Sequence, residues 1–259
     1  MMNFKGTIAG AMLLGMTVMS QSVLANQDAG IKAKITGFEY SDVVDVKISS
    51  NGGKNWATVE AGGYKGTWAN GDAFAAFCVE ISQGLSWGKS LSYTQGTFSS
   101  TVANNLTSLA NKYYSFVDDA ISSAAFQVAI WEIVTETKKG LSLDKGNFEV
   151  DNTTNTTKEW VPNKWIPIFG SWKSTTVDDP ESLAAIDLAK TWLAGINDSS
   201  VAATGDYSLQ YLKNSKSQDL VVFTPIAAVP EPATYGMLLL GMGVIAFIAR
   251  RRRATSIRF

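Results

Sequence analysis

Residues 116–137 constrain the fold more than any other stretch, because apolar side chains occupy almost every side of a helix drawn through them. Two stripes recur at helical spacing, one made of Phe126, Ile130 and Ile133 and the other of Ala120, Ala124, Gln127, Trp131 and Val134. Ser115 and Asp118 have the spacing of a capping box at the start of such a helix. A helix that is apolar all round is buried. We therefore predict a central, buried helix of about six turns.

Gln127 is the unusual residue of this helix, because its amide lies in the middle of an apolar stripe. Burying an amide without a hydrogen-bond partner costs about 1–3 kcal/mol, so we expect a partner nearby. The candidate is Cys78, the only cysteine of the chain, which lies in a predicted strand over residues 74–81. Cys78 and Glu80 share one face of that strand, since side chains alternate along a strand.

The segments AFCVE at 76–80 and AAFQVAIWE at 124–132 carry a resemblance to a known family. An aromatic-Cys-Val strand followed by a helical F-Q-x-A-I-W segment resembles the thioester domains of bacterial surface proteins. The resemblance implies an internal thioester between the sulfur of Cys78 and the side-chain carbonyl carbon of Gln127. It also implies that a primary amine of a partner attacks that carbon and becomes covalently attached.

The residues around this pair have expected roles in the same chemistry. Phe77, Phe126 and Trp131 would exclude water and slow hydrolysis of the bond. Glu80 is the candidate for proton transfer. Two other interpretations stay open, because a lone buried cysteine is usually a small apolar residue. Either the cross-link only stabilises the fold, or no cross-link forms.

The N-terminal residues 1–25 have the order of a secretory signal peptide. Lys5 supplies the positive charge, residues 8–19 form a short apolar run, and Ala25 is the small residue after which we expect cleavage. The mature protein is therefore expected to be exported.

The C-terminal stretch combines three features in a fixed order, which are Pro230-Glu231-Pro232, an apolar run over 233–249, and the basic cluster Arg250, Arg251, Arg252 and Arg253. This order resembles the PEP-CTERM sorting signal of Gram-negative bacteria. The resemblance implies processing by a membrane exosortase. A helical run of this length reaches about 25 Å, slightly less than the hydrocarbon core of about 30 Å. We expect a transmembrane run that anchors the chain transiently in the inner membrane, with a permanent anchor as the alternative.

The charge of the exported part, residues 26–228, argues against nucleic acid as a partner. All five arginines lie in the last ten residues, and Lys5 lies in the signal peptide. This part therefore has sixteen lysines against twenty-two Asp and Glu residues, a net charge of −6. An acidic domain without arginine is a poor nucleic-acid binder. A single cysteine also excludes an internal disulfide, the usual cross-link of small exported domains.

The chain contains no histidine, which removes Ser-His-Asp and Cys-His sites and most catalytic zinc sites. Neither a phosphate-binding glycine loop nor the spacing of a calcium loop is present. Asp178 and Asp179 could serve a glycosidase, but Asp179 before Pro180 is better explained as the start of a helix. We expect no catalytic residue, no cofactor and no metal, and therefore a protein that is not an enzyme.

The order of elements predicts one α+β domain, with mostly antiparallel, barrel-like strands and a helical part that carries Gln127. Strands are expected within 31–48 and at 64–68, 74–81, 207–213 and 218–224, and helices at 104–114, 116–137 and 179–195. Most of 49–66, together with 82–92 and 151–158, is expected to form loops. Trp160, Trp165 and Trp172 suggest a hairpin or a loop packed by its aromatic residues, with a platform for carbohydrate as the alternative.

These features predict an exported surface adhesin or biofilm-matrix protein with a signal peptide at 1–25, an exported domain at 26–228 and a sorting signal at 229–259. The expected partners are an exosortase-type enzyme and an amine-bearing protein or polysaccharide. The membrane is expected to contact the C-terminal segment before processing. The alternative is a structural matrix protein whose cross-link, if one forms, only stabilises its fold.

Overall fold

The computed structural model describes residues 30–136, 140–165, 168–226 and 232–254. The predicted signal peptide with Ala25, and Pro230 and Glu231 of the sorting signal, lie outside these ranges. The chain divides into two compact units, residues 1–30 and 31–259, and all of the elements below belong to the second.

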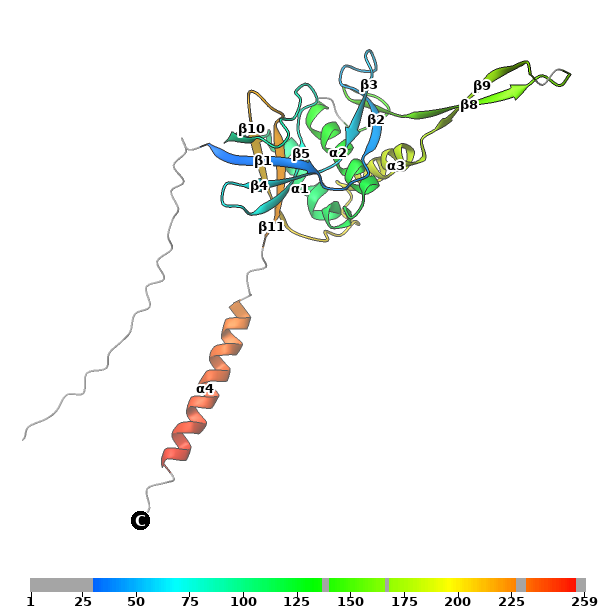
Figure 1. The fold of residues 1–259 in the computed structure, drawn as a ribbon. Helices are drawn as coiled ribbons and strands as arrows, with labels where there is room; N and C mark the ends of the chain where they lie inside the picture. Colours follow the sequence, from blue (N-terminus) through cyan, green and yellow to red (C-terminus); the bar gives the residue numbers. More distant parts are fainter. Residues whose placement is uncertain (1–29, 137–139, 166–167, 227–231, 255–259) are drawn as a thin grey trace, which may run out of the picture. The chain divides into compact units, whose positions relative to one another are not determined.

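In the described part of the chain, six strands form a closed antiparallel barrel in the order β1-β4-β5-β11-β10-β6 (Figure 1). Their bounds are β1 Ile31–Phe38, β4 Tyr64–Trp68, β5 Ala73–Cys78, β6 Ser90–Gln95, β10 Tyr207–Lys213 and β11 Leu220–Pro225. The C-terminal strand of the barrel, β11, pairs with β10 along its whole length and with β5 at two positions. Strands far apart in sequence therefore close the barrel.

A second sheet has the order β3-β2-β7, and three helices contact it or the barrel. The bounds are β2 Val44–Ser49, β3 Ala57–Ala61, β7 Glu149–Asn152, α1 Ser100–Tyr113, the 3-10 helix Tyr114–Phe116, α2 Ala120–Thr135 and α3 Pro180–Gly195. Helix α2 contacts β5 of the barrel, β2 and β3 of the second sheet, and both α1 and α3 (Figure 1). It therefore has packing partners on all sides.

One hydrophobic core runs through the barrel, the second sheet and these helices. All twelve residues from Ser122 to Ile133 of α2 are buried. The predicted α+β class with mostly antiparallel strands and a buried helix carrying Gln127 is confirmed.

The predicted start of the central helix was wrong by four residues. Asp119 has an extended backbone and caps α2, with Ser122 as the other half of the capping box. Ser115 belongs instead to the 3-10 helix that precedes this turn. The box with the earlier spacing, Ser115 and Asp118, does not form because the chain changes direction at Val117.

Several segments expected to be loops are strands. Residues 57–61 form β3 opposite β2, and residues 90–92 are the start of β6. Residues 151–152 belong to β7 and residues 154–158 to β8. The polar composition of 151–158 suggested a loop, but its threonines are β-branched and suit an extended backbone with a partner strand. The local pattern could not reveal that partner.

Strands β8 (Thr154–Pro162) and β9 (Gly170–Asp178) form a hairpin, where a hairpin or a loop was expected, and pair only with each other among the described strands. The predicted packing by its aromatic residues was wrong. Trp160 and Trp172 contact each other edge to face, but they stay 42% and 65% exposed, and Trp165 is 84% exposed. Every residue of the two strands is exposed, because the hairpin is a single layer.

Helix α4 (Pro232–Ala254) forms over the predicted sorting segment. The expectation of a transmembrane helix at 233–249 was wrong, because none of the helices in the described ranges is both long and apolar enough to cross a membrane. The apolar run is short, it contains Gly236, Gly241 and Gly243, and the arginine cluster follows it directly.

Candidate functional site

Cys78 is the last residue of β5 and is fully buried. Its strand lies between β4 and β11, and Cys78 itself lies opposite Leu220 of β11. On the other side, the pairing with β4 ends at Tyr64 opposite Ala76, two residues before Cys78. The backbone of Cys78 therefore needs hydrogen-bond partners from another element.

Helix α2 supplies these partners. The Oε1 atom of Gln127 accepts a hydrogen bond from the Cys78 N–H at 2.8 Å, and its Nε2 donates one to the Cys78 carbonyl at 2.8 Å. One turn earlier, Ser123 Oγ accepts a hydrogen bond from the N–H of Gly63, the residue before β4. Ser123 and Gln127 share one face of the helix. Together they take the place of a neighbouring strand at this edge.

The structure thus brings the two predicted site residues together, in a manner the sequence did not indicate. Gln127 is fully buried, and its partner is the backbone of Cys78. These two hydrogen bonds offset the cost of burying the amide. The N–H that points at Oε1 also polarises the amide carbonyl, and it lies where negative charge develops when a nucleophile attacks the carbonyl carbon.

The sulfur of Cys78 carries its proton near neutral pH. Burial raises the pKa of this thiol to about 12; the Trp131 indole and the Glu80 backbone oppose that rise, and the Glu80 and Asp219 carboxylates add to it. The thiol donates a hydrogen bond to the Glu80 carbonyl oxygen, with 2.6 Å between Sγ and O. Since the thiolate is the nucleophilic form, this thiol reacts only when a base accepts its proton.

Aromatic side chains surround this part of the core. Phe77 and Phe126 are fully buried, with their ring centroids 4.9 Å apart. Trp131 follows Gln127 by one turn and is 3% exposed. Its indole nitrogen has no conventional hydrogen-bond partner in the described chain and acts on the Cys78 thiol as a weak donor. All three residues predicted to exclude water are therefore buried.

Glu80 follows the buried Cys78 by two residues and is partly exposed. Burial raises the pKa of its carboxyl group, and Asp219 raises it further. Its Oε1 atom has no hydrogen-bond partner among the described residues. Two surface hollows, of about 650 and 530 Å³, both have Glu80 in their walls. Neither hollow has Cys78 or Gln127 in its wall, so Glu80 is the residue of this neighbourhood that both hollows reach.

Ser123 and Asp219 belong to this neighbourhood, and sequence reasoning missed both. Ser123 precedes Gln127 by one turn on an apolar helix, which was a usable signal. Asp219 is 5% exposed and accepts hydrogen bonds from the Tyr211 hydroxyl at 2.8 Å and the Asn214 N–H at 2.7 Å. No local pattern indicates Asp219, because closure of the barrel brings it beside β5.

Acidic residues elsewhere have structural explanations. Within the described ranges, no three His, Cys, Asp or Glu residues are grouped so that they could hold a metal ion. Asp179, considered above as a glycosidase carboxylate, caps α3 instead. Its Oδ1 accepts hydrogen bonds from the N–H groups of Glu181 and Ser182.

The C-terminal helix α4 begins at Pro232 and includes the arginine cluster. Residues 228–253 match the PEP-CTERM protein-sorting motif. The motif implies an exported protein that an exosortase sorts to the cell surface. The PEP-CTERM match contains every predicted sorting residue from Pro230 to Arg253.

The PEP-CTERM match is confined to the C-terminal stretch, so it does not include Cys78 or Gln127. The search of curated proteins and the search of solved structures found no match to this chain. The thioester is therefore a proposal that rests on the two motifs and on the geometry of the pair.

Proposed function

We propose that this exported protein forms an internal thioester between Cys78 and Gln127 and uses it to attach amine-bearing partners covalently, in adhesion or in a biofilm matrix. The observation that carries the proposal is the pair of hydrogen bonds between the Gln127 amide and the Cys78 backbone, in a fully buried place. This contact holds the amide against the residue that bears the only thiol of the chain.

Formation of the bond follows from these contacts. The Cys78 sulfur attacks the side-chain carbonyl carbon of Gln127, and the resulting oxyanion at Oε1 keeps its hydrogen bond from the Cys78 N–H. The intermediate then expels Nε2 as ammonia, which takes up the proton of the thiol. Glu80 is proposed to relay that proton, since it follows Cys78 by two residues and the pKa of its carboxyl group is raised.

In the capture step the nitrogen and the sulfur exchange roles, because an amine is now the nucleophile and the sulfur is the leaving group. An uncharged primary amine attacks the same carbon, the carbon–sulfur bond breaks, and the sulfur leaves as the Cys78 thiol after receiving a proton from the amine. Because burial raises the pKa of that thiol to about 12, it is a poor leaving group. The bond is therefore stable towards water and towards weak nucleophiles until a partner amine is held beside it.

The thioester reacts once and does not take part in a catalytic cycle. The bond is consumed when it captures a partner, so the protein is proposed not to be an enzyme. The exported part has a net charge of −6, which disfavours nucleic acid and favours cationic groups such as the lysines of a partner protein or amino sugars. No cofactor takes part in either step.

Intact mass and thiol labelling test the bond directly. Loss of ammonia should lower the mass by about 17 Da, and iodoacetamide should not label Cys78 even in urea, where burial no longer protects a free thiol. Methylamine should then add one molecule at Gln127 and restore labelling of Cys78. Cys78→Ala and Gln127→Ala should abolish both effects, whereas Gln218→Ala, which removes another amide near Glu80, should leave both unchanged. A protein of full mass with a titratable thiol would contradict the proposal.

A structural role for the same pair is the second candidate. It is favoured by the observation that Gln127 and Ser123 already complete the hydrogen bonding at the ends of β4 and β5. A mass deficit without reactivity towards methylamine would assign the bond to this role. If the closed loop of 49 residues acts like a disulfide, either variant should lose about 4 kcal/mol of unfolding free energy.

The C-terminal motif determines how the chain is proposed to be sorted. Residues 233–249 are proposed to associate transiently with the inner membrane while an exosortase processes the chain near Pro230, Glu231 and Pro232. The motif match at 228–253 supports this order of events. The released domain would then act at the cell surface or in the surrounding matrix.

A further inference from the structure

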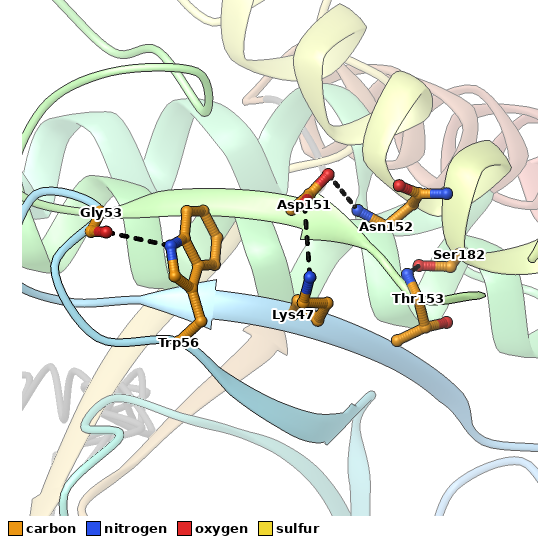
Figure 2. Close-up of polar contacts among 7 residues, drawn as sticks. All are labelled: Lys47, Gly53, Trp56, Asp151, Asn152, Thr153 and Ser182. Atoms are coloured by element: carbon orange, nitrogen blue, oxygen red, sulfur yellow. Dashed lines mark hydrogen bonds and ion pairs between the residues drawn. The ribbon is translucent and has the colours of Figure 1, made fainter. Parts of the chain in front are cut away.

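The β8–β9 hairpin is held firmly at its base. The N–H of Thr153, directly before β8, donates a hydrogen bond to Ser182 Oγ of α3 at 3.1 Å (Figure 2). The Thr153 carbonyl accepts one from the N–H of Asp179 at 2.9 Å, and Asn155 binds the Asp179 carboxylate at 3.0 Å. Nine residue pairs then join the strands without a register shift. The hairpin is therefore an ordered projection from the cap of α3.

The character of the hairpin changes along its length. Near the base, the strands carry mainly threonines, including Thr156 opposite Thr176. The far end, which we call the hairpin tip (residues 158–165 and 168–173), carries large apolar residues. Among these, Trp165 is 84% exposed, Ile168 is 83% and Phe169 is 63%. Monomeric proteins rarely expose so many large apolar side chains together, so the hairpin tip is expected to have a binding partner.

Charge identifies the kind of partner. The hairpin tip carries Lys158, Lys164 and Lys173 against Glu159, a net charge of +2, while the rest of the exported part therefore has −8. Lys164 lies 5.9 Å from the centroid of the Trp165 ring, so cationic and apolar groups are adjacent. This combination suits an anionic lipid surface, where apolar groups enter between headgroups and lysines pair with phosphates.

The geometry disfavours the two obvious alternatives. A carbohydrate platform needs a flat aromatic face, but the rings of Trp160 and Trp172 are inclined by 65°. A protein partner covers one face of a hairpin, whereas this one presents apolar residues on both faces and at the turn. Trp160 lies on one face, Val161 on the other, and Trp165 beyond the strands. A surrounding medium such as lipid covers all three at once.

We propose that the hairpin tip inserts into the headgroup region of an anionic lipid surface, with Trp165, Ile168 and Phe169 entering and the three lysines holding the phosphates. The site is separate from Cys78 and Gln127, and it does not depend on the thioester. It would place the domain against a membrane surface while the reactive pair stays free to meet a partner.

Co-sedimentation of the full chain with lipid vesicles tests this inference. The probes are vesicles of phosphatidylglycerol and phosphatidylcholine in equal parts, and vesicles of phosphatidylcholine alone. The wild type should bind the anionic vesicles more tightly, and binding should weaken as salt is raised. The double variant Trp165→Ser/Phe169→Ser should bind at least about ten-fold more weakly, because both apolar groups are lost. Phe116→Ser, which removes an aromatic side chain that is 53% exposed elsewhere, should bind as the wild type does.

Because the C-terminal tail is itself proposed to associate with membranes, the comparison is repeated with residues 233–259 deleted from every chain, which leaves the barrel complete at Pro225. The differences then report on the hairpin tip. Unchanged melting temperatures would show that the variants fold, as expected for substitutions at exposed positions. Equal vesicle binding by the wild type and the double variant would overturn the proposal. Two other results would also overturn it, in each case with vesicle binding unchanged in the double variant. One is that the double variant loses binding to an insoluble polysaccharide, and the other is that it loses self-association in ultracentrifugation.

Discussion

Glu132 is a carboxyl group in the apolar part of α2, with no exposed surface. One of its oxygens accepts a hydrogen bond from the Ser142 N–H at 2.6 Å, and the other has no partner among the described residues. Burial raises its pKa to about 7, and the nearby Glu136 adds to the rise. The folded protein therefore holds a proton on Glu132 over a pH range in which the unfolded chain has lost it.

This proton makes stability depend on pH. Between the ordinary pKa of 4.5 and the raised value of about 7, the folded state binds more protons, so the unfolding free energy should fall as the pH rises. Above about 7 the loss of unfolding free energy is complete, at roughly 3 kcal/mol. Glu132→Gln imitates the protonated form and should flatten the profile. Chemical denaturation at pH 5 and pH 8 measures the difference, with Glu159→Gln on the exposed hairpin as the control. An unchanged slope in Glu132→Gln would contradict the assignment.

Residue types alone predicted which residues meet at the site. A buried amide on an apolar helix needs a partner, and Cys78 was correctly chosen as the residue nearby. The contact itself could not be predicted, because it depends on β4 ending two residues before Cys78. The contact of Ser123 could not be predicted for the same reason, since its partner Gly63 lies directly before β4.

At the scale of elements, the capping box of α2 is the feature most open to a simple test. The Asp119 carboxylate accepts hydrogen bonds from the Ser122 N–H at 2.7 Å and the Ser122 hydroxyl at 2.6 Å. Asp119→Ala should lower the unfolding free energy by about 1 kcal/mol, as for other lost caps. Asp118→Ala is the matched control, because Asp118 contacts Ser122 through its backbone N–H. Equal losses in urea denaturation would show that the cap is unimportant.

Elements with clear end signals were predicted well. Asp179 followed by Pro180 and a final Gly195 gave the bounds of α3, and β4 and β10 were also placed correctly. The failures came where the partner is distant in sequence. Residues 57–61 become a strand because β2 lies beside them, and the threonines of β8 become a strand because β9 does.

At the scale of the whole molecule, the PEP-CTERM tail should be dispensable for folding. The barrel is complete at Pro225, before the matched motif begins at residue 228. Deleting residues 233–259 should therefore release the domain from cells in soluble form with an unchanged melting temperature. Circular dichroism and fractionation of the culture test both parts. A mature native protein that permanently retains Arg250–Arg253 in the membrane would identify a plain anchor instead.

The class of the whole molecule could be predicted, but its closure could not. Strands followed by helices and again by strands indicated an α+β domain with antiparallel pairing, and the structure confirms it. The pairing of β5 with β11 joins residues about 140 positions apart in sequence, and no local signal specifies it. The position of Asp219 beside β5 and the raised pKa of Cys78 both depend on that pairing.

The position of β11 also orders events in time. One barrel neighbour of β5, the strand β4, is synthesised shortly before it. The other neighbour, β11, is among the last parts of the domain to be synthesised. Until residues 220–225 have crossed the export machinery, Cys78 has no strand on that side and its sulfur is still open to water. Any chemistry that needs a dry Cys78 must therefore wait until export of the domain is nearly finished. By then only the sorting tail is still to be exported. The reactive bond would therefore first appear in a domain that has already left the cytoplasm, and the abundant free amines of the cytoplasm could not consume it.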